Sequence, residues 1–348
     1  MIQTNSNNRI IYFDVLRIIA AFAVVFSHVS SQRFNECFPS GEWITRMIYD
    51  AFGRWSVPVF VMISGALFLD EHKKVNIKRL YTKNIVRIII VFLFWSFIYA
   101  IYDGLYKNGL IGFVLGTIHG PFHFWFLKLM IGLYIIVPIL RAVVKDKKLE
   151  LYFLCVAMLT PLIVTLFSPI IGYFSEEAKD FVTSYYNSLE LNIVSGHVGI
   201  FVLGHFLSKY RVSSSIKKLL YPMGIISLIA VCLITYFASY NLGEVYDQFY
   251  DSLNIFTLFE ATAVFVFIKS INISTRYYPL LIRVSKTSLG IYLLHVLILH
   301  IADDFFGINS SLFNPAFFIP LYSLFVFIVS FVIVSILLRI PVMKRFVI

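Results

Sequence analysis

Apolar stretches of about 20 residues recur along this chain, and they constrain its fold more than any other feature. A helix of about that length crosses the roughly 30 Å hydrocarbon core of a bilayer. Only 14% of the 348 residues are charged and 59% are apolar, whereas a soluble domain has about 25% charged residues. Because lipid offers no hydrogen bonds to an open backbone, these stretches predict helices. We expect an all-α, polytopic membrane bundle.

Ten such stretches predict ten transmembrane helices within a single domain covering residues 1–348. The predicted spans are 11–30, 53–69, 86–103, 122–140, 150–171, 191–207, 219–239, 254–270, 285–302 and 316–338. No small-residue cleavage site follows the first stretch, so we interpret it as a retained helix and not as a signal peptide. The three cysteines are too few and too scattered for a disulfide framework or a zinc site. They are Cys37, Cys155 and Cys232.

Basic residues alternate strictly between the connecting loops. They concentrate before the first span, in every second loop after it and in the C-terminal tail, and these segments hold 22 of the 29 Lys and Arg residues. The loops between them are acidic or nearly neutral. Since an excess of Lys and Arg marks cytoplasmic loops, the pattern predicts a bacterial inner-membrane protein with both ends in the cytoplasm. It also accounts for the net charge of +10 without a nucleic-acid partner.

Three ionisable residues lie in the first predicted span, namely Asp14, Arg17 and His28. Ionisable groups are expensive in a membrane and usually mark a functional site. Eleven residues separate Arg17 from His28, which leaves them about 20° from three full helical turns and about 16 Å apart. Both side chains should therefore share one helix face. Asp14 is within reach of an ion pair with Arg17; the alternative is that the pair lies at the interface and His28 only caps the helix.

Polar residues in later spans supply further candidates. Ser64-Gly65 should allow close helix packing, with a ligand contact by Ser64 as the alternative. His123 and Trp125 begin the fourth span, where an imidazole and an indole suit a sugar's hydroxyls and its apolar face. His295, late in the ninth span, lies at a depth where it can approach His28; a hydrogen-bonded core position is the alternative.

Two further pairings follow from residue type alone. Lys128 lies deep in the fourth span and needs an anion, and Glu260 in the eighth span is the candidate partner. His119 and His123 have a spacing that suits a metal ion. No third ligand lies nearby in the sequence, so we expect no metal.

Four segments, in order, resemble the acyltransferase family 3 membrane proteins over nearly the whole chain. The family has an aspartate, then a basic residue, ten residues and a histidine, which match Asp14, Arg17 and His28. SVPVFVMISGALF, HFWFLKLMIGLYIIVPIL and SLGIYLLH match its later segments. The chain looks most like the short members that lack a fused extracytoplasmic domain. One region departs from the family, since Lys83-Asn84 and Arg87 stand where it often has paired arginines.

The resemblance implies transfer of an acyl group, usually acetyl, from cytoplasmic acetyl-CoA to a hydroxyl of a lipid-linked or cell-surface glycan. His28 would be the general base, since an imidazole accepts a proton near neutral pH. Arg17, Lys83 and Arg87 would bind the donor's phosphates, and Asp14 would orient Arg17. The alternative is a proton-coupled transporter of a glycan-related solute, because buried Arg, Lys, Glu and His also suit a carrier.

Overall fold

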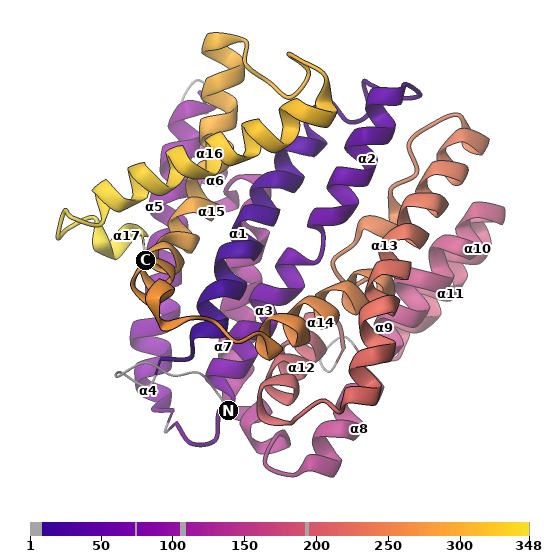
Figure 1. Cartoon of the computed structure of the whole chain (residues 1–348), viewed down its shortest axis with the longest axis vertical. Coiled ribbons are helices and arrows are strands. Elements are labelled where there is room, and N and C mark those ends of the chain that lie inside the picture. Colours follow the sequence, from indigo (N-terminus) through magenta and orange to yellow (C-terminus); the bar gives the residue numbers. More distant parts are fainter. Residues whose placement is uncertain (1–8, 74, 105–108, 192–194, 348) are drawn as a thin grey trace.

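The structure is a computed structural model that describes residues 9–73, 75–104, 109–191 and 195–347. Every regular element in these residues is a helix, as predicted (Figure 1). The helices are α1 (Ile11–Ser31), α2 (Gly41–Gly53), α3 (Ser56–Phe68), α4 (Ile77–Arg79), η1 (Leu80–Ile85), α5 (Val86–Tyr102), α6 (Gly109–His119), η3 (Phe122–Phe124), α7 (Trp125–Val143), α8 (Lys147–Ala157), α9 (Leu159–Leu162), η4 (Ile163–Phe167), α10 (Ser168–Phe174), α11 (Glu176–Ser188), α12 (His197–Lys209), α13 (Ser214–Leu242), η6 (Gln248–Tyr250), α14 (Ile255–Ser270), η7 (Thr275–Tyr277), α15 (Tyr278–Phe306), α16 (Pro315–Leu337) and α17 (Lys344–Val347).

Within the described residues, nine helical segments are long and apolar enough to cross a membrane, and they correspond to nine of the ten predicted spans. The sixth prediction, 191–207, differs: α12 has only 13 residues, and residues 192–194 lie outside the described part of the chain. The second span is longer than predicted, because α2 and α3 together form a segment from Gly41 to Phe68.

Two helices that the apolar pattern did not indicate lie beside the predicted spans. α2 begins at Ser40, whose hydroxyl accepts the backbone N–H of Trp43 as an N-cap. α11 is a polar helix with Glu176 and Glu177 in its first turn, where carboxylates interact favourably with the helix dipole. Neither helix has the continuous apolar character that marks a span, so a search for apolar stretches overlooks them.

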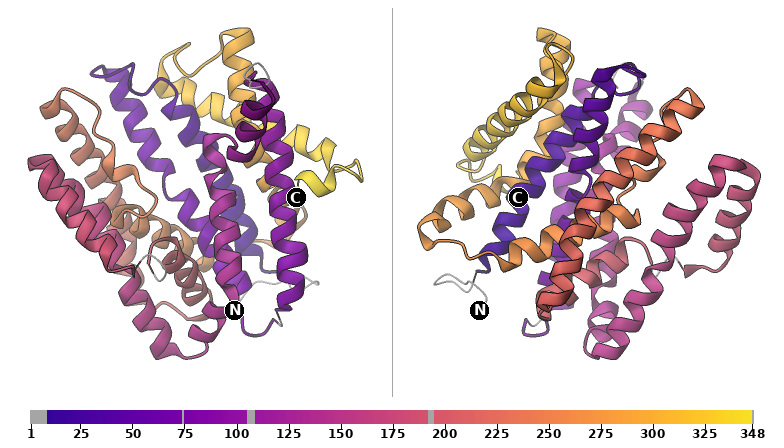
Figure 2. Two further views of the ribbon diagram at one scale, coloured as in Figure 1. Left: turned by 180° about the vertical axis from the view of Figure 1, so that it is seen from behind. Right: turned by 45° about the vertical axis from the view of Figure 1, so that its right-hand side comes forward.

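α1 lies at the centre of the bundle and packs against α2, α3, α14, α15 and α16 (Figures 1 and 2). In Figure 1 the N-terminus, α4 and α8 lie at the lower end, and the start of α2 lies at the upper end. The lower end is therefore the one that the charge pattern predicts to be cytoplasmic. α1 runs from this end to the opposite one, so its two ends belong to different faces of the protein.

The closest helix contact joins α3 to α12 through two glycines. A Cβ atom on Gly65 would lie 1.7 Å from the carbonyl oxygen of Phe201, and one on Gly204 would lie 2.0 Å from that of Met62. Each glycine thus lets the other helix's backbone approach. This confirms the close packing predicted from the Ser64-Gly65 pair.

The helix contact can be tested by adding one methyl group. Gly65→Ala should lower the stability of the purified protein by about 1–3 kcal/mol, because overpacking forces α3 and α12 apart. Gly132→Ala is the matched control, since nothing lies within 4 Å of a Cβ atom there; it should be neutral or stabilising by up to about 1 kcal/mol. Thermal unfolding in detergent measures both. Equal melting temperatures of the Gly65→Ala and Gly132→Ala proteins would show that α3 and α12 have room for an added methyl group at Gly65.

Orientation can be tested with single cysteines in a chain whose three native cysteines are changed to serine. We expect Asn35→Cys, between α1 and α2, to react with a membrane-impermeant maleimide in intact spheroplasts. Lys145→Cys, between α7 and α8, should react only after lysis, because basic loops remain in the cytoplasm. Both positions are exposed. If only Lys145→Cys reacts in intact spheroplasts, the true topology is the inverse of the predicted one.

Candidate functional site

Two histidines from different helices meet inside the bundle. His28 lies in the last turn of α1, and His295 lies on α15 with 0% of its surface exposed. The Nε2 atom of His295 is 3.2 Å from the Nδ1 atom of His28. The structure therefore brings together two residues that are 267 positions apart, as their predicted depths allowed.

The surrounding carbonyl groups determine where the imidazole protons lie. The Nδ1 atom of His295 is 2.7 Å from the Tyr292 carbonyl oxygen and 3.2 Å from that of Ile291. Carbonyl oxygens only accept, so this nitrogen carries the proton of the neutral ring and Nε2 is an acceptor. The Nδ1 atom of His28 then lies between this acceptor and the Val24 carbonyl oxygen, 2.9 Å away. We assign its proton to Nδ1, which leaves a free lone pair on Nε2 of His28.

His28 borders a cavity of about 580 Å³, a volume suited to a small ligand. The cavity is formed by the end of α1, the α2–α3 junction, the start of α7, the start of α12, the segment before α14, and α15. Its polar and aromatic lining includes Ser27, His28, Arg54, Phe122, His123, Trp125, His197, Tyr250, Asp251, Ser252 and Tyr292. The charge pattern predicts that the helix ends around it face outward. We call this cavity the outer pocket.

His123 and Trp125, predicted to bind a sugar, both line the outer pocket. His123 is 1% exposed, and its ring centroid lies 6.2 Å from that of His28 and 5.7 Å from that of His295. Its carbonyl oxygen accepts a hydrogen bond from the Tyr292 hydroxyl, which joins η3 to α15. Both ring nitrogens of His123 are buried and neither has a hydrogen bond of normal geometry, although the Leu293 backbone lies beside the ring.

His197 also belongs to the outer pocket, although its sequence context did not single it out. Its ring centroid is 5.6 Å from that of Trp125, and its Nε2 atom is 3.0 Å from the Ser252 hydroxyl. His197 is the first residue of α12, a helix whose start was misplaced in the predicted span. The displaced boundary is the reason that its role was missed.

A buried carboxylate organises the side of the pocket next to His28. Asp50 is 1% exposed and accepts hydrogen bonds from the Ser27 hydroxyl and from the Arg54 guanidinium. Arg54 also lies over the Tyr250 ring, 4.8 Å from its centroid. Gly53 lets α2 approach α1 here, because a Cβ atom on it would lie 2.8 Å from that of Ser27. The i, i+4 spacing of Asp50 and Arg54 was the only sequence signal for this pair, which sequence reasoning missed.

Asp14 is fully buried at the other end of α1. It accepts hydrogen bonds from Arg9, at 2.8 Å to Nε and 2.5 Å to Nη2, and from the Ser285 hydroxyl at 2.6 Å. The predicted partner, Arg17, is 3.6 Å from the same carboxylate. The Asp14–Arg17 ion pair is present, but it is longer than the contacts with Arg9 and Ser285.

Arg17 lies in a second polar group, away from the outer pocket. Tyr134 of α7 interacts electrostatically with Arg17 and Arg87, and its hydroxyl lies beside that of Ser64. Lys83 and Arg87 are exposed on η1 and α5. Of the predicted donor-binding residues, Arg17 and Arg87 thus share a neighbour, and Ser64 belongs to this group and not to the lining of the outer pocket.

The predicted Lys128–Glu260 pair is wrong. The Lys128 ammonium donates to the carbonyl oxygen of His119 at 3.2 Å and lies 6.0 Å from the centre of the Phe92 ring. Glu260 instead faces α13, where it interacts with Cys232. Both spans are apolar nearly all round, so the sequence indicated the depth of each side chain but not its direction. Among the described residues, no group of three or more His, Cys, Asp or Glu side chains is placed to hold a metal ion.

A comparison with protein families bears directly on this arrangement. A family model described as an acyltransferase domain, that of acyltransferase family 3, matches residues 10–338. The chain belongs to acyltransferase family 3. No curated protein and no solved structure matches the chain. Together with the apolar helices, the membership makes this protein a multi-pass membrane acyltransferase, which confirms the predicted family and favours the enzyme over the transporter.

The buried carboxylate beside His28 provides a test of the site's framework. Asp50→Asn should destabilise the protein by about 1.5–3 kcal/mol, because it weakens a hydrogen-bonded ion pair in the interior. Glu36→Gln, in the exposed Arg33–Glu36 pair at 3.9 Å, should cost less than about 0.5 kcal/mol. Thermal unfolding of the two purified variants measures the difference. Equal small shifts would mean that Arg54 is held mainly by its other contacts.

Proposed function

We propose that this protein is an O-acetyltransferase of a bacterial inner membrane. It moves an acetyl group from cytoplasmic acetyl-CoA to a hydroxyl of a cell-surface or lipid-linked glycan. The observation that carries this proposal is the His28 imidazole beside the outer pocket, with its Nδ1 atom in contact with Val24 and His295; our assignment of the proton to Nδ1 leaves Nε2 as the acceptor. Membership of the acyltransferase family supports the reaction class, and the acetyl donor and the glycan acceptor are our inference.

The chemical step needs one base and one leaving group. His28 Nε2 takes the proton of the acceptor hydroxyl while the hydroxyl oxygen bonds to the acetyl carbonyl carbon. The carbon–sulfur bond of the thioester then breaks, and the CoA thiolate takes the proton from His28, which restores the neutral imidazole. An acetyl-imidazole intermediate would use the same nitrogen. Arg54 lines the same pocket and would stabilise the negative charge that develops on the carbonyl oxygen.

The donor would approach from the opposite end of α1. Arg17, Lys83 and Arg87 are the cations proposed to bind its phosphates, since guanidinium and ammonium groups bind phosphate oxygens strongly. Arg17 and Arg87 interact with the same tyrosine, and Arg17 lies on the α1 face that it shares with His28. The extended arm of CoA would run outward along this face until the thioester reaches the histidine. Asp14 would hold Arg17 at the start of this route.

The acceptor would occupy the outer pocket. Trp125 offers an aromatic face for a sugar ring, while His123 and His197 offer nitrogens for its hydroxyls. Because the pocket lies at the helix ends predicted to face outward, the acceptor would be a glycan outside the cytoplasm or linked to a lipid. Among the short family members, the segments quoted above look most like those of the stand-alone O-acetyltransferase of enterobacterial common antigen, and this resemblance is our reason for proposing a lipid-linked polysaccharide as the acceptor.

Substitutions at the two ends of α1 should change different kinetic constants. Arg17→Ala should raise the KM for acetyl-CoA, because it removes a phosphate contact, and activity should recover as the donor concentration rises. His28→Gln should still bind acetyl-CoA but lower kcat by about 10²–10⁴-fold, because glutamine cannot take the proton. Transfer of radiolabelled acetyl from acetyl-CoA to the glycan and lipid fractions of membranes measures both effects.

His300→Gln is the control for this experiment. His300 lies on α15 near the Tyr102 ring, 6.0 Å between ring centroids, and outside the outer pocket, so its variant should retain activity. If well-expressed His28→Gln protein transfers acetyl at the wild-type rate, His28 is not the base. His123 and His295 would then be tested next.

A further inference from the structure

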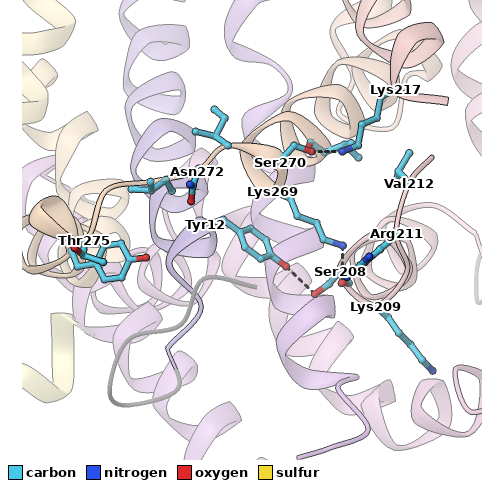
Figure 3. Close-up of a pocket in the computed structure, with 14 residues that line it drawn as sticks. Tyr12, Ser208, Lys209, Arg211, Val212, Lys217, Lys269, Ser270, Asn272 and Thr275 are labelled. Atoms are coloured by element: carbon cyan, nitrogen blue, oxygen red, sulfur yellow. Dashed lines mark hydrogen bonds between the residues drawn. The ribbon is translucent and has the colours of Figure 1, made fainter. Parts of the chain in front are cut away.

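A second and larger cavity, of about 910 Å³, opens near the start of α1. It lies between the end of α12, the start of α13, the end of α14 and the segment that leads to α15 (Figure 3). Its polar lining includes Tyr12, Ser208, Lys209, Arg211, Lys217 and Lys269. We call it the basic cavity, because four of these residues are Lys or Arg and none is Asp or Glu.

Two of the four cations of the basic cavity, Lys269 and Lys217, are held in place by neutral groups. Lys269 donates to the carbonyl oxygens of Leu207, Ser208 and Tyr210 at 2.5, 2.8 and 3.0 Å, which are acceptors at the end of α12. Lys217 donates to the Ser270 hydroxyl at 2.7 Å. Figure 3 shows Lys269 reaching toward Ser208, whose hydroxyl is 3.0 Å from that of Tyr12. These two positive charges therefore have fixed positions.

Most of this charge has no counterion in the part of the chain that the structure describes. Lys209 pairs with Glu71 at 2.8 Å, but Arg211, Lys217 and Lys269 form no ion pair within the described residues. Lys217 and Arg211 are close enough to Lys269 to repel its ammonium group. Like charges gathered in a partly enclosed space raise the free energy of the empty cavity and concentrate anions there. A ligand with several negative oxygens would offset this repulsion.

The basic cavity is separate from the proposed path of the acetyl donor. Tyr12, which lines the cavity, is sixteen residues before His28 on the same helix. That separation turns it about 160° around α1 from His28, whereas Arg17 lies within about 20° of the His28 face. An anion in the basic cavity would therefore lie on the opposite side of α1 from Arg17 and His28.

We propose that the basic cavity binds a phosphate group at a site distinct from the acyl-transfer site. Lys and Arg donors arranged in a concave site suit phosphate oxygens, and Tyr12 and Ser208 add hydroxyl donors. The phosphate belongs either to an anionic lipid, whose headgroup lies at the predicted cytoplasmic surface, or to a soluble phosphorylated compound. The inference does not depend on the proposed acetyl transfer.

The experiment uses the full-length protein purified in detergent with two probes. Pyrophosphate binding is measured by calorimetry, and retention of phosphatidylglycerol is measured by native mass spectrometry. The combined change Arg211→Ala with Lys217→Ala should weaken at least one of these interactions by about tenfold or more, because it removes two charged donors. Arg211→Lys with Lys217→Arg should retain binding. The control, Arg339→Ala with Lys344→Ala, removes two exposed cations elsewhere and should bind as the wild type does.

The outcomes distinguish a soluble phosphate from a lipid headgroup, and binding in the basic cavity from binding on the donor side of α1. Loss of pyrophosphate binding in the alanine pair indicates a soluble ligand, and loss of lipid adducts indicates a headgroup; either supports the proposal. Equal binding of both probes to the alanine pair and to its control overturns it. So does a loss caused by Arg17→Ala but not by the alanine pair, since the phosphate would then bind on the donor side of α1.

Discussion

The arrangement of this protein depends on two polar contacts between α1 and α15. Asp14 accepts a hydrogen bond from the Ser285 hydroxyl at 2.6 Å, and further along both helices His28 meets His295 at 3.2 Å. In the apolar interior of a membrane bundle such contacts hold helices in register, because lipid offers the polar groups no other partner. The residues proposed for catalysis are therefore also residues that fix the central helix, so their placement does not rest on loops.

The same contacts bear on the number of membrane crossings. The earlier residue of α1, Asp14, contacts the earlier residue of α15, Ser285, and the later residue, His28, contacts the later one, His295. The two helices therefore run parallel, and parallel transmembrane helices of one chain are separated by an odd number of membrane crossings. Six of the long segments lie between them, so shorter helices must supply a further crossing, and α12 coincides with the sixth predicted span. At 1.5 Å per residue its 13 residues span only about 20 Å, less than the bilayer core. Charge alternation predicts a crossing here because it counts loops, whereas hydropathy misplaced its start because α12 is short.

Local geometry was predictable from the sequence, and contacts between helices mostly were not. The shared face of Arg17 and His28 follows from one helical period, and the packing at Gly65 follows from the absence of a side chain. In contrast, the hydrogen bonds of Asp50 and the place of His197 depend on how α2 and α12 dock, which no spacing within one segment reveals. The failed pairing of Lys128 with Glu260 has a similar cause. A helix that is apolar nearly all round carries no signal for the direction of one polar side chain.

The pairing of two imidazoles also restricts how a proton can move through the site. Both rings cannot be cations at once, because two like charges so close together repel each other strongly in a medium of low dielectric constant. The carbonyl groups of Tyr292 and Ile291 fix the Nδ1 proton of His295, so that its Nε2 atom can only accept. When His28 takes a proton from a bound hydroxyl, its Nδ1–H therefore keeps a hydrogen bond to a neutral His295. A proton passed from His28 to His295 Nε2 would find no further acceptor, because the Nδ1–H of His295 faces only carbonyl oxygens. The added proton therefore leaves the pair through His28 Nε2, toward the pocket where a leaving thiolate would need it.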